Sequence, residues 1–122
     1  MIDIIAIGLG GFFGAILRWC VSILSIKIFG LGFPIGTLIV NCVGSFLMGC
    51  LYAYMRNYEI NEVFRAFMGI GFLGALTTFS TFSSESFLLF QQEAFFKGIL
   101  NIFLNVFLCI MLVKIGMMIF NK

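Results

Sequence analysis

The segment GIGFLGALTTFSTFSSES, residues 69–86, decides how this chain folds. Its first part is apolar and rich in glycine, whereas residues 77–86 contain seven hydroxyl side chains, two phenylalanines and Glu85. We expect it to lie inside a membrane-spanning helix that breaks near Gly74 to Thr78, because a bilayer tolerates freed backbone groups only where protein or a wet cavity satisfies them. A single Ser or Thr could simply bond a carbonyl of its own helix. Seven hydroxyls in ten residues favour a functional role instead.

The rest of the chain is strongly apolar. Of 122 residues, 62% are hydrophobic and 10% are charged, and the mean hydropathy is +1.19. A soluble domain of this size could not bury so much apolar surface. We therefore predict an all-α membrane protein with one transmembrane domain, residues 1–122, and four helices at about 4–26, 34–55, 63–90 and 95–120. Pro34 suits the first turn of its helix, and the polar run RNYEINE at 56–62 predicts a loop.

Composition also excludes several classes. The chain has no histidine, and its net charge of +2 is not gathered into a basic cluster, which argues against imidazole-based metal or acid–base chemistry and against nucleic acid as a partner. The N-terminus carries Asp3 rather than a basic region, so we expect the first helix to be retained. The four cysteines form no CxxC pair and are interpreted as small buried apolar residues: Cys20, Cys42, Cys50 and Cys109.

Small residues recur at a spacing that favours close helix packing. The pairs are Gly10 with Gly14, Ser45 with Gly49, and Gly71 with Ala75. In a bilayer such pairs let two backbones approach and gain van der Waals contact.

Polar residues also follow one face of the second and fourth predicted helices. Thr37, Asn41 and Ser45 lie at i, i+4 and i+8, and we expect Asn41 to face the third helix as a donor in a pore. Asn101 and Asn105 have the same spacing, and either hydrogen bonding between helices or a pore role would explain them.

Two charges are not explained by helix ends. A charge at the bilayer centre costs about 2.5–3.5 kcal/mol on insertion scales. Arg18 lies near enough to the end of its helix to reach the interface, which leaves a functional and an interfacial interpretation open. Glu85 is open as a proton site, a cation site or a structural acceptor.

Phe79 and Phe82 lie at i and i+3 among the hydroxyls. The edge of an aromatic ring carries positive potential, so a ring turned edge-on can help to hold an anion that has lost water. Hydroxyls and an amide beside it add donors without a competing fixed charge. This chemistry suits a small, strongly hydrated anion.

These segments together resemble the Fluc (CrcB) family of fluoride channels. The resemblance is carried by GGFFGAILRW at 10–19, PIGTLIVNCVGSFLMG at 34–49 and GFLGALTTFSTFSSE at 71–85, and it covers the whole chain. It implies a passive fluoride-selective channel rather than an enzyme, which exports fluoride from the cytoplasm across a bacterial inner or plasma membrane. It also implies an antiparallel homodimer of dual topology with two pathways, each lined by both chains.

The resemblance further implies roles for individual residues. The family's phenylalanine pair corresponds to Phe79 and Phe82, and its pore asparagine to Asn41. Its hydroxyl track corresponds to Ser80, Thr81 and Ser83, with Thr37 on the face of Asn41. A central structural Na⁺ would be held by the backbone carbonyls of Gly74 and Thr77. Arg18 and Glu85 remain candidates for vestibule or structural charges, and the roles of Asn101 and Asn105 stay open because relatives often have Tyr and Ser there.

Two other functions fit a small four-helix membrane protein. A proton-coupled multidrug exporter should carry a membrane-embedded carboxylate in its first helix, where this chain has only Asp3 at the very end. An assembly or sensor subunit would not require the hydroxyl run at 77–86.

The basic residues divide almost evenly between the two predicted sides of the membrane. The side of the termini has Arg56, Arg65, Lys114 and Lys122, and the other side has Arg18, Lys27 and Lys97. With four against three, the positive-inside rule predicts little preference, so both orientations should insert.

Overall fold

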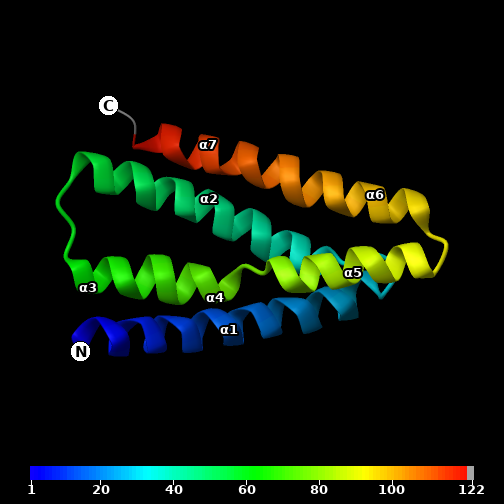
Figure 1. Ribbon diagram of the computed structural model, residues 1–122, viewed down its shortest axis with the longest axis horizontal. Helices are drawn as coiled ribbons and strands as arrows, with labels where there is room; N and C mark the ends of the chain where they lie inside the picture. The colour runs from blue at the N-terminus through cyan, green and yellow to red at the C-terminus, as the bar shows by residue number, and fades with distance from the viewer. Residues whose placement is uncertain (121–122) are drawn as a thin grey trace.

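The computed structural model describes residues 1–120, and its regular elements are helices arranged as four long rods (Figure 1). The first two rods are α1 (Ile2–Phe29) and α2 (Ile35–Asn57). The third rod combines α3 (Glu62–Arg65), η1 (Ala66–Leu73), α4 (Gly74–Leu76) and α5 (Phe79–Gln91). The fourth combines α6 (Phe95–Phe103), η2 (Leu104–Leu108) and α7 (Cys109–Ile119).

Each rod is long and apolar enough to cross a membrane, and the protein is therefore a multi-pass membrane protein. The predicted helix ends lie within about three residues of those observed. Pro34 precedes the first helical residue as the N-cap of α2 rather than lying in the first turn. Gly30, with a φ of 77°, lets the chain leave α1 at a sharp angle. The N-terminus lies at the same end of the molecule as the α2–α3 connection and the end of α7 (Figure 1).

The third rod contains two residues with extended backbone. Thr77 (φ −82°, ψ 156°) and Thr78 (φ −152°, ψ 123°) separate α4 from α5, and Figure 1 shows the chain crossing this gap without a helical turn. Both residues fall inside the interval from Gly74 to Thr78 where the sequence predicts a break in the helix. The π-helical segments η1 and η2, in contrast, have no counterpart in the hydropathy pattern.

Close backbone contacts hold the rods together in two pairs, α1 with η1 and α2 with α7. A Cβ added at Gly10 would lie 2.8 Å from the backbone nitrogen of Phe72, and one at Gly71 would lie 2.6 Å from the carbonyl oxygen of Ile7. These distances are too short for any side chain, so glycine is required at the crossing of α1 and η1.

The same requirement applies where α2 meets α7. Gly49 packs against the backbone of Val113, and Gly116 packs against the backbone of Phe46 and Cys50. Ser45, which the spacing paired with Gly49, is only half-buried, and the neighbouring Gly44 instead makes room for the Thr77 side chain. The apolar core between the rods is small and centres on three residues: Val40, Leu73 and Leu76.

Candidate functional site

The interruption between α4 and α5 is satisfied by a side chain of α2. Asn41 Oδ1 accepts the Thr78 N–H at 2.8 Å, and Asn41 Nδ2 donates to the Thr78 carbonyl at 3.1 Å. The amide thus pairs with both backbone groups of Thr78, as a neighbouring strand would. A free N–H or C=O inside a membrane span would cost several kcal/mol (order of magnitude), which explains why a polar side chain stands opposite this residue.

Both protons of the Asn41 amide are engaged. Besides its bond to Thr78, Asn41 Nδ2 donates to Asn105 Oδ1 at 2.8 Å. The sequence predicted that Asn41 faces the third helix, and its contact with Thr78 agrees with that placement. In the single chain, however, Asn41 has no spare donor to offer to an anion.

The hydrogen bonds continue from Asn105 along the fourth rod and then to α5. Asn105 Nδ2 donates to Asn101 Oδ1 and to the Asn101 carbonyl, each at 3.0 Å. Asn101 Nδ2 then donates to Ser86 Oγ at 2.9 Å, and Ser86 Oγ donates to the Phe82 carbonyl at 2.8 Å. Asn101, Asn105 and Ser86 are all buried.

Phe79 and Phe82 form an edge-to-face pair beside this network. Their ring centroids are 5.3 Å apart with an interplanar angle of 64°. Phe82 is 6% exposed, but Phe79 is 77% exposed on the outside of the chain. Both rings line a cavity of about 290 Å³ that also borders Asn41, Thr77 and Asn105.

The hydroxyl groups of α5 divide into two sets. Thr78 caps the helix, since its Oγ1 accepts the Thr81 N–H at 3.2 Å, and the same Oγ1 lies 3.1 Å from Thr81 Oγ1 and 3.4 Å from Ser80 Oγ. The second set bonds carbonyls four residues earlier in the helix: Ser83 to Phe79, Ser84 to Ser80, and Ser86 to Phe82. Ser83, which the family resemblance assigns to the hydroxyl track, therefore donates its hydroxyl proton to a carbonyl of its own helix.

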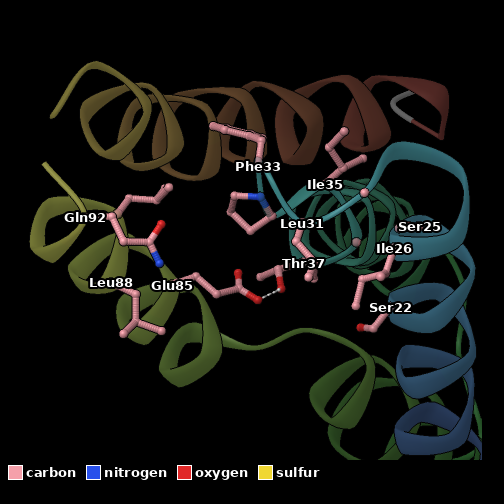
Figure 2. Close-up of a pocket in the computed structure, with 14 residues that line it drawn as sticks. Ser22, Ser25, Ile26, Leu31, Phe33, Ile35, Thr37, Glu85, Leu88 and Gln92 are labelled. Carbon is pink, nitrogen blue, oxygen red and sulfur yellow. Dashed lines mark hydrogen bonds between the residues drawn. The ribbon is translucent and has the colours of Figure 1, made fainter. Parts of the chain in front are cut away.

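Thr37 and Glu85 meet at a second polar position. Thr37 Oγ1, which is buried, donates to Glu85 Oε1 at 2.9 Å. Figure 2 shows this pair at the wall of a cavity of about 350 Å³ whose other lining residues include Ser22, Ser25 and Gln92. Glu85 Oε2 is buried and has no hydrogen-bond partner within residues 1–120.

The predicted cation ligands lie at the interruption. In a continuous helix the Thr78 N–H would donate to the Gly74 carbonyl, but it donates to Asn41 instead. The Gly74 carbonyl is thus left without its usual partner four residues later. The Thr77 hydroxyl donates its proton to the Leu73 carbonyl at 2.9 Å, which leaves its oxygen lone pairs unused by this bond.

Arg18 is separate from these groups. It lies half-buried on α1, and within the described part of the chain it forms no ion pair. The four cysteines are free thiols, with Cys20 exposed and the other three half-buried.

The sequence did not predict the hydrogen bonds that join the fourth rod to the interruption. Asn101 and Asn105 were identified as a polar pair, but their link to Asn41 required the packing of rods two, three and four. Ser86 belongs to the hydroxyl run and was not singled out. The i, i+4 spacing of the two asparagines was the available signal.

Comparison with known proteins agrees with this architecture. A family model described as CrcB-like protein, Camphor Resistance (CrcB), matches residues 5–117. The chain is 52% identical over 116 residues to proteins of Shewanella amazonensis and Shewanella piezotolerans, each named fluoride-specific ion channel FluC. A protein of the same name from Shewanella frigidimarina is 51% identical. Each alignment covers 95% of this chain and 94% of the relative. A match over this share of the chain, at this identity, places the protein in the CrcB family.

Proposed function

We propose that this protein is a fluoride channel, which lets fluoride leave the cytoplasm passively across a bacterial inner or plasma membrane. The observation that carries the proposal is the edge-to-face pair of Phe79 and Phe82, set among hydroxyl groups inside a membrane span. Relatives about half identical to this chain bear the name of a fluoride-specific ion channel, which supports the same function. No catalytic group is needed for this activity, because the membrane potential drives the anion outward.

A fluoride ion in a narrow pathway must exchange its hydration shell for several weaker contacts in series. Ser80 and Thr81 are exposed on α5 and supply hydroxyl donors, and the ring edges of Phe79 and Phe82 supply positive potential. Asn41 acts beside them by holding the backbone of Thr78, and it contributes a donor to the ion only by releasing Thr78 or Asn105. Glu85 lies farther along α5, where it accepts a hydrogen bond from Thr37 of α2.

The exposed face of α5 supports a homodimer. Phe79, Ser80, Thr81 and Ser84 are exposed on a single chain, although they belong to a membrane span. Hydroxyl groups facing lipid favour contact with other polar groups in the same membrane. A second copy covering this face would complete the pathway, and the even distribution of basic residues favours an antiparallel arrangement of the two copies.

The same interface is the proposed location of a structural Na⁺. Hard cations prefer oxygen ligands. The Thr77 carbonyl belongs to the extended backbone, and the Gly74 carbonyl, at the start of α4, loses its helical partner because the Thr78 N–H donates to Asn41. Gly74 is exposed on the single chain, which suits a site shared between two copies. The bound ion would supply positive charge that holds the two interruptions together.

The decisive experiment measures fluoride release from proteoliposomes with a fluoride electrode after a potassium ionophore has set the membrane potential. We expect rapid, potential-driven release of fluoride and little release of chloride under the same conditions. A proton-coupled exporter would instead depend on a pH gradient and transport an organic cation. Release no faster than from protein-free liposomes, with the reconstituted protein dimeric, would refute the proposal.

A further inference from the structure

Resting on the proposed channel function, we infer that Asn105 and Asn101 are positioning residues that hold the helix interruption in place through Asn41. Within the described residues neither asparagine has a hydrogen bond to the backbone of Thr77 or Thr78, yet a continuous series of hydrogen bonds links both of them to Thr78. The fourth rod would thereby control the geometry of the pathway through Asn41 and Thr78.

Apart from the bond that Asn41 returns to the Thr78 carbonyl, the hydrogen bonds in this series run in one direction. The Thr78 N–H donates to Asn41, and Asn41 donates to Asn105 at 2.8 Å. Asn105 donates to Asn101 at 3.0 Å, and Asn101 donates to Ser86 at 2.9 Å. The last donor in the series is the Ser86 hydroxyl, which bonds the Phe82 carbonyl at 2.8 Å.

This directionality fixes the orientation of every amide. If Asn105 turned its amide by 180°, its NH₂ group would face the NH₂ group of Asn41 and its oxygen would face Asn101 Oδ1. Both contacts would then pair like with like. The orientation of Asn41, which determines whether it can pair with Thr78, is therefore set by Asn105.

Burial makes the coupling strong. Asn101 is 0% exposed, Ser86 is 5% exposed and Asn105 is 7% exposed. Water cannot readily replace a missing partner at these positions, so a broken link leaves a buried polar group unsatisfied. The loss is transmitted to the next member of the series rather than absorbed by solvent.

The two ends of the series lie on either side of Phe79. Thr78 precedes α5 as its N-cap, and the Phe82 carbonyl belongs to the first turns of the same helix. Tying both points to α2 and to the fourth rod fixes where α5 begins and how it is rotated. The placement of the Phe79 and Phe82 rings follows from that rotation.

The test compares Asn105→Leu and Asn101→Leu with Val113→Ala, a control that removes two methyl groups from α7 outside the series and keeps the backbone contact with Gly49. Hydrogen–deuterium exchange is followed at the peptide containing Thr77 and Thr78, in the absence of fluoride, and fluoride release is measured on the same preparations. In both Leu variants we expect exchange at Thr78 to rise about tenfold and fluoride release to fall about tenfold. The control should leave both quantities near their wild-type values.

The effect of Asn101→Leu on Thr78 is the sharpest part of the test, because Asn101 acts there only through two other side chains. Unchanged exchange at Thr78 in both Leu variants would overturn the inference, as would an equal rise in Val113→Ala. Faster exchange with unimpaired fluoride release would also overturn it, since the pathway would then tolerate a loosened interruption. Hydrogen–deuterium exchange is measured without fluoride, so its result does not depend on whether the protein conducts fluoride. Failure of this inference can therefore be distinguished from failure of the channel proposal.

If Asn105→Leu yields no folded dimer, Asn105→Ser takes its place. A serine hydroxyl can accept one hydrogen bond and donate another, so it preserves part of the series. We expect exchange at Thr78 between that of the wild type and about tenfold above it. Exchange equal to that of the wild type, with Asn101→Leu also unchanged, would contradict the inference.

Discussion

At the scale of single residues, the two phenylalanines of the pair have different surroundings. Phe82 is buried within its own chain, whereas most of the Phe79 side chain is exposed. Their rings are arranged edge-to-face, so one ring edge meets the face of the other ring and the remaining edges could hold an anion. Electrostatic and packing roles can therefore be separated by substitution.

Phe79→Ile and Phe82→Ile should each reduce fluoride release steeply, by about tenfold or more, because isoleucine has no ring edge with which to hold an anion. Phe82→Ile should also cost about 1–2 kcal/mol of stability, since it alters a buried contact. Phe103→Ile is the control: Phe103 is exposed on α6, and the one ring that it contacts among the described residues is that of Phe107. The ring-edge role is falsified if both variants, purified as dimers, release fluoride at the wild-type rate.

Asn41→Asp should abolish fluoride release. A carboxylate cannot donate to the Thr78 carbonyl or to Asn105 Oδ1, and its charge repels an anion. Size-exclusion chromatography establishes that the dimer persists, and a fluoride electrode measures release. Asn57→Asp, at the end of α2 and bonded to the Phe120 carbonyl, is the matched control and should conduct normally. Normal release by a folded Asn41→Asp dimer would remove Asn41 from the pathway.

At the scale of elements, glycine decides how closely α1 approaches η1. Gly10→Ala should prevent normal folding or lower stability by several kcal/mol (order of magnitude), because its Cβ would lie 2.8 Å from the Phe72 nitrogen. Gly8→Ala is the control, since no atom of residues 1–120 lies within 4 Å of a Cβ at that position. The fraction of monodisperse protein after heating compares the two variants. Equal stability would mean that the two helices can separate without cost.

The interruption depends on the N-cap of α5. Thr78→Val removes the hydroxyl that accepts the Thr81 N–H, and we expect a loss of about 1 kcal/mol with a lower unfolding temperature. Ser84→Ala is a matched control because the Ser84 hydroxyl bonds only the Ser80 carbonyl of its own helix. A thermal unfolding midpoint unchanged by Thr78→Val would show that the cap is dispensable.

At the scale of the whole molecule, the distribution of charge predicts dual topology. The end of α2 and α3, which carry Arg56 and Arg65, lie at the end of the molecule that holds the N-terminus (Figure 1). The end of α1 and the start of α6, which carry Lys27 and Lys97, lie at the opposite end. Lys122, which also entered the count, lies outside the described residues. C-terminal reporters that are active on only one side of the membrane should both give signal. A single orientation would argue against an antiparallel dimer.

Adding a positive charge at one end should change the proportion of chains inserted in each orientation. Replacing Asn57 by Lys, at the end of the molecule that holds the N-terminus, should favour the orientation with this end in the cytoplasm, and the reporter ratio should shift accordingly. Coexpression with a chain biased the opposite way should restore fluoride release if both orientations are required. Full activity of a chain in one orientation alone would contradict the antiparallel arrangement.

The sequence by itself determined the fold class, the four spans and the polar character of the third one. Hydropathy over about 20 residues is a local property, and it does not depend on which helices become neighbours. The same holds for the pairing of Phe79 with Phe82, which the i, i+3 spacing already brings together. Resemblance to a family added the residues expected to meet the ion.

The tertiary structure decided which polar groups satisfy one another. Asn41 bonds Thr78 across 37 positions of sequence and Asn105 across 64, and no periodicity within one helix contains such information. The glycines in contact, such as Gly44 against Thr77 and Gly116 against Cys50, likewise depend on how the rods cross. In a membrane every buried backbone group must find a partner inside the protein. The choice of partner is made when helices pack, which is why the asparagine series is visible only in the folded chain.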